Sequence, residues 1–580
     1  MKIFKLFPLA CAALMMTACA TDNDENGGGT KPAGDAQYLA VNIMNVGTTP
    51  TRATEDYVNG TDDENKINTI RFYFFHADGS PYVLTNTTET TTGTDVNWLE
   101  KTNPTTKAPT PAGQGTVDKV TEAVLVIQGK SLAAPATMVA VINPETLKDN
   151  ATNNKGTVTL SELRDSKFDT QFYKLNAAGT TNEAFVMTNS VYREGGNTIC
   201  PTLVSGHLET SDVAAKNNPV NIYVERVAAK VSAKVDDNNL KLGHGTDWAT
   251  DQYGMEVGTF GKSTKIYAVI EGWGIADENS QAMLEKQIDA TWTNTNLGIT
   301  PWNTADYHRS FWETMKPAVG TDIYKKANHS FKQYTNKIAN NFTNITYTLP
   351  NTTQTVVSDV YNGNNLTKFL VAATLKYYDG TTWKNADICR YRGIEYMGGE
   401  AKLKEVVAAT YNKYYTKNTT TGEYEPLAAS DIKFDYARSV ENTSAKKVED
   451  CQMVPTLVDV TKVYYTKNVS GTGYTPVADY KIVVKDIEMY PADIRVNGKT
   501  YYYVPIRHLG AAATNPAYYG VVRNHYYQVN LQSLKGFGSS VYNPDREIKP
   551  VIPAEETSYL AAQINVLQWR VVKQDVNLGK

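Results

Sequence analysis

The side chains that could do chemistry are few, and they form no catalytic arrangement. The chain has 7 His in 580 residues, and none stands in the H-E-x-x-H spacing that binds zinc on a helix. No G-x-S-x-G sequence marks a nucleophilic serine. The sequence GTFGKS at 258–263 has two residues between its glycines, where a phosphate-binding loop needs four. We therefore expect no catalytic residue and no cofactor.

The remaining acidic and thiol groups do not predict a metal site. The cluster Asp62-Asp63-Glu64 lacks the alternating ligands of a calcium loop, and we expect a solvated turn there. Three scattered cysteines, Cys200, Cys389 and Cys451, have no C-x-x-C spacing and cannot all pair with one another. Buried free thiols are the expected state.

Cys19 is the one residue whose surroundings predict a covalent modification. Lys2 and Lys5 precede an apolar run at 7–16 that is too short to span a bilayer as a helix. A small Thr-Ala pair follows, so that Cys19 stands in a sequence that resembles the lipobox of bacterial lipoproteins. We expect a signal peptide at 1–18 and membrane attachment only through the lipid. A soluble secretory peptide cut nearby is the alternative.

Length, charge and composition limit the classes of protein to which the chain could belong. At 580 residues the chain is too long for one core, so two or more units are expected. The net charge of −4 gives no basic face for nucleic acid. The 37 Tyr, with many Thr and Asn, favour strands joined by polar turns. We predict a mostly β fold.

Alternating apolar residues place strands along the first half. Leu39, Val41 and Ile43 fall on one face of a strand near the start of the mature chain. The sequence KINTIRFYFFHADG then puts Ile70, Phe72 and Phe74 on one face and ends in the turn Asp78-Gly79. The apolar pattern of 220–235 predicts one long strand that closes this half, with the boundary near 236.

Two helices and one repeat stand out among the strands. Thr159 or Ser161 could cap a short helix near 159–168. The sequence EAKLKEVVAATYNKYY places Leu403, Val406, Val407 and Tyr411 on one helical face. YYTKNTTTGEYEP from Tyr414 and YYTKNVSGTGYTP from Tyr464 align without gaps, and we interpret them as paired hairpins, with a tyrosine-lined ligand site as the alternative.

Several segments together resemble the type V pilins of Bacteroidales, and specifically the minor-fimbrillin family. These segments are KINTIRFYFFHADG, FVMTNSVY from Phe185, VERVAAKV from Val224, EGWGI around Trp273, HRSFWE from His308, RYRGIEY from Arg390, VVRNHYYQVNLQSLKGFG, and the closing INVLQWRVVKQDVNL. The resemblance implies two β-sandwich-like, transthyretin-like domains in tandem with a few short helices. It implies an outer-membrane lipoprotein precursor whose mature form builds a cell-surface fimbria.

The resemblance also implies how the fimbria assembles. A protease cuts after an arginine that follows the first strand, and the C-terminal strand of another copy fills the groove that opens. Arg52-Ala53 lies in the matching place, so an arginine-specific protease would remove the propeptide 19–52 with its strand residues Leu39, Val41 and Ile43. The implied partners are other copies of the chain and accessory anchor and tip subunits. The adhesion ligand stays unspecified.

Domain limits and donor residues follow from this scheme. We expect an N-terminal domain with the acceptor groove at 53–236 and a C-terminal domain at 237–580 that ends in a donor strand at 572–580. The alternation of apolar residues changes phase within 564–571 and then continues. This change predicts one strand that completes the subunit's own sheet, followed by a separate extension. The residues of the extension that share a face are Val572, Gln574, Val576 and Leu578. The alternative is an ordinary last strand that pairs within its own subunit.

Three other functions stay open. The chain could be an accessory tip or anchor subunit of the same fimbria. It could be a surface glycan-binding lipoprotein that uses Trp302, Trp312 or Trp383 as sugar platforms. A hydrolase is the third, because the carboxylates of glycosidases carry no local sequence signature.

Overall fold

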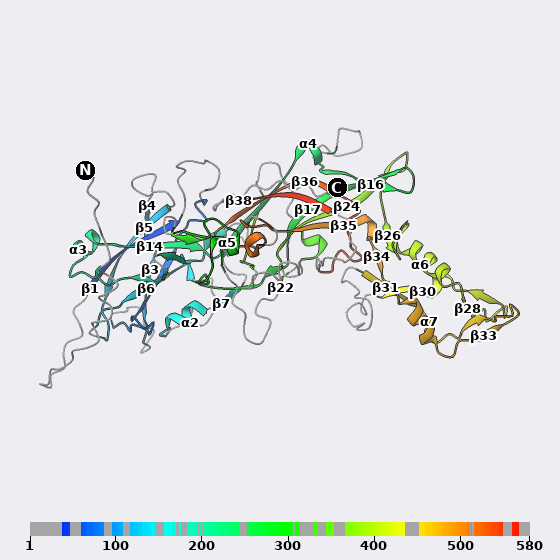
Figure 1. Cartoon of the computed structure of the whole chain (residues 1–580), viewed down its shortest axis with the longest axis horizontal. Helices are drawn as coiled ribbons and strands as arrows, with labels where there is room; N and C mark the ends of the chain where they lie inside the picture. Colours follow the sequence, from blue (N-terminus) through cyan, green and yellow to red (C-terminus); the bar gives the residue numbers. More distant parts are fainter. Residues whose placement is uncertain are drawn as a thin grey trace.

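The computed structural model describes residues 37–46, most of 58–548, and 559–567. The longer gaps within 58–548 are 86–94, 108–116, 145–155, 243–251, 314–325, 335–343, 353–365 and 436–451. Figure 1 shows an elongated molecule made mostly of strands, which confirms the predicted fold class. Within the described residues, no helix combines the length and apolar character needed to cross a membrane.

A nine-stranded sheet lies at one end of the molecule (Figure 1). Its strands run in the order β3-β2-β6-β10-β14-β1-β5-β4, and β13 pairs with β6. Their bounds are β1 (Gln37–Val46), β2 (Thr69–Phe75), β3 (Trp98–Thr102), β4 (Thr105–Lys107), β5 (Val117–Ile127), β6 (Thr137–Ile142), β10 (Met187–Asn189), β13 (Thr202–Leu203) and β14 (Val220–Arg226). The sheet curls, because Leu84 forms bridges both with Val96 before β3 and with Gly129 after β5.

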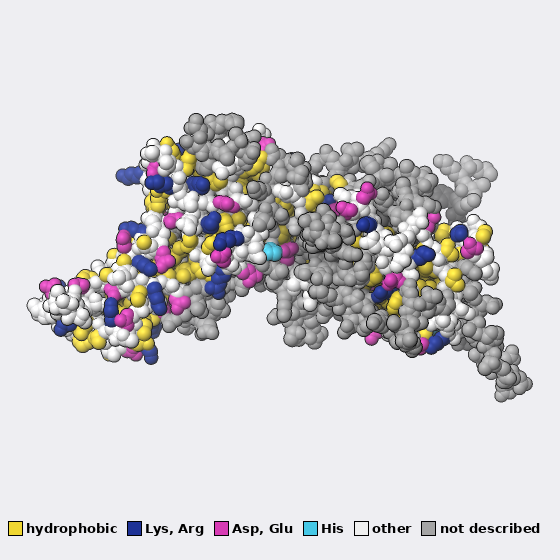
Figure 2. Space-filling view, turned by 180° about the vertical axis from the view of Figure 1, so that it is seen from behind, with side chains coloured by type: hydrophobic (Ala, Val, Ile, Leu, Met, Phe, Trp, Pro, Cys, Tyr) yellow, Lys and Arg dark blue, Asp and Glu magenta, His cyan; other side chains and the backbone are white. Residues whose placement is uncertain are grey.

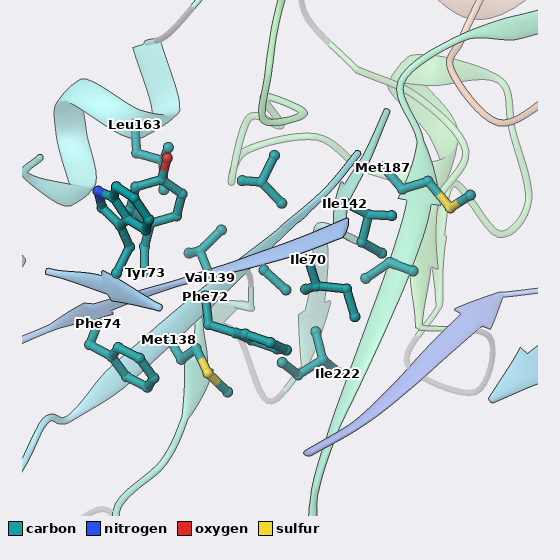
Figure 3. Close-up of a cluster of buried hydrophobic side chains, with 14 of the residues drawn as sticks. Ile70, Phe72, Tyr73, Phe74, Met138, Val139, Ile142, Leu163, Met187 and Ile222 are labelled. Atoms are coloured by element: carbon teal, nitrogen blue, oxygen red, sulfur yellow. The ribbon is translucent and has the colours of Figure 1, made fainter. Parts of the chain in front are cut away.

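Strand β2 is buried on both of its faces. Ile70, Phe72 and Phe74 have no exposed surface, as their alternation predicted, but neither has Tyr73. In Figure 3 Tyr73 points toward Leu163 of helix α2 (Leu160–Asp165), whereas Phe72 points toward Ile222. The helix therefore covers the face of β2 that the alternation pattern assigned to solvent.

Thr159 caps α2, as the sequence predicted. The backbone N–H of Glu162 donates to Thr159 Oγ1 over 3.2 Å, and the N–H of Thr159 donates to Glu162 Oε2 over 2.8 Å. This reciprocal pair satisfies two backbone donors at the start of the helix.

A β-sandwich follows the first sheet. Its four-stranded layer has the order β23-β15-β36-β38, and its six-stranded layer has the order β16-β17-β24-β35-β37 with β25 on β24. The bounds are β15 (Ala229–Val235), β16 (Gly254–Phe260), β17 (Thr264–Ala276), β23 (Ile345–Thr348), β24 (Lys368–Tyr378), β25 (Trp383–Asn385), β35 (Lys499–Pro505), β36 (Tyr526–Lys535), β37 (Ser539–Ser540) and β38 (Tyr559–Leu567). Val231, Trp273, Val371 and Tyr527 belong to the core that both layers share.

The predicted single strand over 220–235 is wrong, because the chain changes sheets within it. Val227 N–H donates to the carbonyl of Val186 beside the first sheet, over 3.1 Å, whereas Lys230 N–H donates to the carbonyl of His525 beside the sandwich, over 2.9 Å. Val227 and Ala228 are both fully buried at this crossing. An apolar pattern that continues through two cores does not reveal where one sheet ends. The chain thus passes from one sheet to the other before residue 236. The predicted domain limits, 53–236 and 237–580, stay a prediction.

Residues 386–498, here called the inserted unit, interrupt the six-stranded layer. β24 pairs directly with β35, so the chain leaves and re-enters the sheet between neighbouring strands. The unit has a core of its own, and in Figures 1 and 2 it projects at the end of the molecule opposite β1. Its elements are β26 (Ile388–Tyr391), β27 (Ile394–Met397), α6 (Gly399–Thr410), β28 (Tyr414–Lys417), β29 (Tyr424–Pro426), β30 (Ile432–Asp435), β31 (Gln452–Leu457), β32 (Tyr464–Lys467), β33 (Tyr474–Pro476), α7 (Tyr480–Ile487) and β34 (Ala492–Ile494).

Several sequence predictions within the inserted unit are confirmed. Helix α6 buries Leu403 and Val407 completely, and Tyr411 at its C-terminal end almost completely, whereas Val406 is only half-buried. The helix ends at Thr410, before the predicted end at Tyr415, because β28 begins at Tyr414. The two tyrosine repeats form hairpins, β28-β29 and β32-β33, joined through β28 and β32. Cys389 is a buried free thiol, and burial raises its pKa to about 12. Cys200 and Cys451 lie outside the described residues.

Shorter elements connect these parts. They are β7 (Lys167–Asp169), β8 (Tyr173–Leu175), β9 (Asn182–Phe185), β11 (Tyr192–Glu194), β12 (Asn197–Ile199), α3 (Asp212–Asn217), α4 (Asp237–Leu240), β18 (Glu278–Asn279), β19 (Gln281–Met283), α5 (Asn294–Leu297), β20 (Asn303–Thr304), β21 (Arg309–Ser310) and β22 (Lys326–Ala327). The GTFGKS sequence forms the turn between β16 and β17, with Gly261 at φ +64°.

Candidate functional site

Strand β1 occupies the interior of the first sheet although it comes first in the chain. It pairs antiparallel with β5 along its whole length, from Gln37 opposite Ile127 to Val46 opposite Val117. On its other side it pairs parallel with β14, where Val41 lies level with Val220. The strand is therefore held by backbone ladders on both sides.

The inward side chains of β1 are part of the core. Leu39 and Val41 have no exposed surface, and they lie opposite Leu125 and Ala123 of β5. Both join the cluster that contains the buried residues of β14. The backbone of Ile43 continues the ladder opposite Ile222, while its side chain lies outside the described part of the structure. The predicted strand residues Leu39 and Val41 thus occupy the core positions that the alternation required.

Without β1 the sheet would have a slot one strand wide. β5 would keep only β4, which pairs with Val120 to Glu122, and β14 would keep only β10 on its far side. The facing edges would each present unpaired N–H and C=O groups above an uncovered apolar floor. Bare edges of this kind are templates for another strand.

A half-open cavity of about 480 Å³ lies against β1 beside Ala40 and Val41. It is bounded by β5, by Lys216 of helix α3 and by Pro219. Ala40 and Val41 are themselves buried, so the cavity does not expose the strand.

Glu64, which lies after the predicted cleavage point in the sequence, is anchored by residues outside β1. Glu64 is buried, and Lys230 Nζ lies 2.7 Å from its Oε1. Tyr347 Oη donates to the same oxygen over 2.6 Å, and Arg226 Nε donates to the Glu64 carbonyl over 2.9 Å. Asp62 and Asp63 are exposed, but the prediction of a solvated turn is wrong for Glu64, because its cationic partners come from distant strands.

The charge of Glu64 is stabilised inside the protein. Burial alone would raise the pKa of its carboxyl, but the charges of Lys230 and Arg226 and the hydrogen bonds from Lys230 and Tyr347 outweigh burial and hold the pKa below its ordinary value. Three further buried ion pairs lie elsewhere in the described residues: Glu225 with Lys286 at 2.8 Å, Glu313 with Arg523 at 2.9 Å, and Asp277 with Lys368. Sequence reasoning missed all four pairs.

Replacing Glu64 by Gln should destabilise the chain by about 3–5 kcal/mol, because it leaves Lys230 buried without its counter-charge. Chemical denaturation followed by tryptophan fluorescence measures the loss. The depressed pKa means that this stability is present above the unfolded value of 4.5 and is lost as pH falls through the folded pKa, so the two proteins should converge in acid. Glu256→Gln, which breaks the exposed pair with Lys265, is the control and should barely shift the midpoint. An equal shift for both variants would contradict the anchoring role.

The C-terminal strand β38 lies at an edge. It pairs antiparallel with β36, from Tyr559 opposite Lys535 to Leu567 opposite Tyr526, and has no neighbour on its other side among the described residues. This agrees with the predicted strand that completes the home sheet. The donor residues Val572, Gln574, Val576 and Leu578 lie outside the described residues, as do Cys19, Arg52 and Ala53.

The structure removes two of the three proposed sugar platforms. Trp302 and Trp312 are buried, at 6% and 1% exposure, and belong to a small core with Phe311. Trp383 lies partly exposed on β25 between Tyr267 and Tyr378. Isolated tryptophans in a loop-rich sequence can form a core of their own, which the sequence pattern did not reveal. The described residues hold no group of three or more His, Cys, Asp or Glu that could bind a metal ion.

Comparison with known proteins locates a family match at the C-terminal end. Residues 495–575, which include β35, β36 and β38, match the family described as "Major fimbrial subunit protein type IV, Fimbrillin, C-terminal". No curated protein matches the chain.

Solved structures that match most of this chain are cell adhesion and fimbrial proteins of Parabacteroides and Porphyromonas. A putative cell adhesion protein from Parabacteroides distasonis has 11% identity and a TM-score of 0.36, over 92% of this chain and 98% of that one. A fimbrilin from Porphyromonas gingivalis has 12% identity and a TM-score of 0.32, over 93% and 98%. The tip fimbrial protein Mfa3 from Porphyromonas gingivalis has 10% identity and a TM-score of 0.30, over 92% and 100%.

The likeness to fimbrillins lies in the matched segment, residues 495–575. That segment supplies the sandwich strands next to the chain terminus, and it agrees with the resemblance drawn from VVRNHYYQVNLQSLKGFG and INVLQWRVVKQDVNL. Residues 495–575 of this chain thus resemble the C-terminal part of the fimbrillins, which are fimbrial subunits.

Proposed function

We propose that this protein is a shaft subunit of a cell-surface fimbria and that it polymerises by exchanging β-strands. The observation that carries the proposal is the position of β1, an N-terminal strand seated between β5 and β14 in the interior of a sheet. A cut at Arg52-Ala53 would release β1, and a second copy's residues 572–580 would fill the slot.

The anchoring of Glu64 supports this order of events. Glu64, which the mature chain would retain, is held by Lys230, Tyr347 and Arg226, none of which belongs to β1. The sheet could therefore lose its first strand while the adjoining chain stays in place. Until the cut, β1 itself blocks the slot, so that assembly waits for the protease.

The energetics of refilling favour a durable joint. Three to five apolar side chains at about 1.5–3 kcal/mol each would give on the order of 5–15 kcal/mol before ordering costs. Each backbone hydrogen bond of the restored ladders adds about 1 kcal/mol net. Donor and acceptor are different surfaces, so the contact is head-to-tail and does not close on itself. The product is a filament.

N-terminal sequencing of the surface protein, beside an unboiled gel, tests the proposal. The expected result is a start at Ala53 and a ladder of heat-labile multimers. A start at lipidated Cys19 with monomers only would favour an anchor subunit or a monomeric surface lipoprotein instead, and would contradict a shaft role.

Leu39→Ala should lower the unfolding free energy of the precursor but not that of the mature subunit. Leu39 is fully buried, so its truncation should cost the precursor about 2–5 kcal/mol of unfolding free energy. The mature subunit no longer contains the residue and should unfold as the wild type does. Leu125→Ala on β5, which both forms retain, is the matched control and should destabilise both. Equal loss from Leu39→Ala in the two forms would mean that β1 stays in the mature fold.

A further inference from the structure

The inserted unit carries a four-stranded sheet, β29-β28-β32-β33, built from the two tyrosine repeats. β28 runs antiparallel to β32 with Tyr415 opposite Tyr465. Each of these strands also forms a hairpin with the strand that follows it. The two copies are therefore related by an approximate twofold axis through the sheet, so the tyrosines and lysines that they share occur twice on the same face.

One face of this sheet is structural. Tyr414 and Tyr464 are 3% and 1% exposed and belong to the core of the inserted unit. Both hydroxyls are used inside the protein: Tyr414 Oη donates to Asp486 Oδ2 over 2.7 Å, and Tyr464 Oη donates to the Asp459 carbonyl over 2.6 Å. The first tyrosine of each repeat thus attaches the sheet to the unit.

The opposite face carries the other four tyrosines of the repeats in a compact cluster. The rings of Tyr424 and Tyr474 stack at 4.3 Å with an interplanar angle of 14°. Tyr415 meets Tyr474 edge-on at 4.7 Å, and Tyr424 meets Tyr465 edge-on at 4.9 Å. All four are partly exposed, and within the described part of the chain their hydroxyls make no hydrogen bond to protein. Ring edges and four polar groups are therefore offered to solvent together.

Two lysines flank the cluster. Lys417 lies across the hairpin from Tyr424, and Lys467 lies across its own hairpin from Tyr474, so both share the tyrosine face. Neither forms an ion pair with a described carboxylate, and Lys417 Nζ lies 5.4 Å from the Tyr424 ring centre. Glu425 lies opposite Thr416 and thus on the other face. The antiparallel register places the two lysines roughly 13 Å apart along the strands, at opposite ends of the cluster.

We propose that this face, the tyrosine platform formed by the four tyrosines and two lysines, binds a glycan that carries carboxylate or sulfate groups. Sugar rings present C–H faces beside many hydroxyls, and the platform presents aromatic rings beside free phenol groups. The unpaired ammonium groups supply the charge complementary to an acidic sugar. The proposal does not depend on strand exchange, because the platform contains no residue of β1 or β38.

The location suits a surface that stays accessible. β28 and β33 lie at the end of the molecule farthest from β1 (Figure 1), and the same end projects clear of the sandwich in the view from behind (Figure 2). The hairpin loop beside β32 is also exposed, with Val469 fully in solvent. Filling the slot between β5 and β14 would leave this end uncovered.

Binding of the full mature chain to immobilised hyaluronan octasaccharide and 3′-sialyllactose tests the proposal, with lactose and a poly-glutamate peptide as comparisons. The double variant Lys417→Gln with Lys467→Gln should weaken binding to at least one acidic glycan by about tenfold or more, because each exposed lysine would contribute a charged hydrogen bond. Tyr424→Phe with Tyr474→Phe keeps the rings and should weaken binding by a smaller factor. Lys402→Gln with Lys404→Gln on α6 removes the same charge elsewhere in the unit and should change nothing.

Each other outcome overturns the proposal. Binding to neither acidic glycan, or binding that the platform variants leave unchanged, excludes the site. Equal binding to lactose excludes the role of charge, and binding to poly-glutamate alone would make the partner an acidic protein. Filament assembly measured on the same variants should be normal, so failure here is distinct from failure of the shaft proposal.

Discussion

An Arg52→Ala variant is expected to accumulate as an unpolymerised precursor that keeps residues 37–46. The physical reason is that β1 is tethered to its own slot, and a tethered strand competes at an effective concentration of about millimolar or more against a donor from solution. β1 is also held by ladders to both β5 and β14. Gel mobility without boiling and electron microscopy of the cell surface measure the outcome.

Two further variants make the Arg52 result specific. Arg52→Lys keeps the charge and should also block assembly if the protease is specific for arginine. Adding Thr51→Arg to Arg52→Ala restores a cleavable bond one residue earlier and should restore filaments. Normal filaments from Arg52→Ala alone would show that release of β1 at this bond is not required.

Truncation of residues 572–580 is expected to give a processed, folded subunit that cannot join another. The home strand β38 ends at Leu567, so the truncation leaves its pairing with β36 intact. The joint would lose the 5–15 kcal/mol of apolar burial, which corresponds to a fall of on the order of 10³-fold or more in affinity between subunits. Sedimentation of the purified mature protein measures assembly, and its thermal unfolding checks the fold.

A matched pair of point variants assigns the donor face. Val576→Asp would bury an unpaired carboxylate in the slot and should weaken the joint by about 100-fold or more. Asn577→Asp adds the same charge on the opposite face of the extended strand and should have little effect. If both variants assemble equally well, the donor residues Val572, Gln574, Val576 and Leu578 are wrongly assigned.

The local elements of this fold could be predicted because they depend on local patterns. Alternation identified β1 through Leu39 and Val41, and helical spacing identified α6 through Leu403 and Val407. Duplication of the tyrosine repeat predicted two hairpins, and the structure adds that β28 and β32 join them. Each of these patterns is contained in one or two short stretches of the sequence.

The features that the sequence did not reveal depend on distant partners. Nothing near Glu64 shows that Lys230 will neutralise it, and the same holds for Glu225 with Lys286. The change of sheet between β14 and β15 was not predicted, because one continuous apolar pattern supplies buried residues to both cores. The inserted unit was missed because β24 and β35 pair across it, a relation that no local period records.

Cysteine cross-linking across the slot would show which strand lies between β5 and β14 in the filament. Asn221 on β14 is exposed and lies level with Asn42 of β1, so a cysteine at 221 reports which strand occupies the slot. In a background without Cys200, Cys389 and Cys451, Asn221→Cys is combined with a single cysteine at Lys573, Asp575 or Asn577. Disulfides between different subunits of the filament are expected at one of these positions. Filaments whose subunits retain residues 37–46, and in which Asn221→Cys pairs with Asn42→Cys of the same chain, would contradict strand exchange.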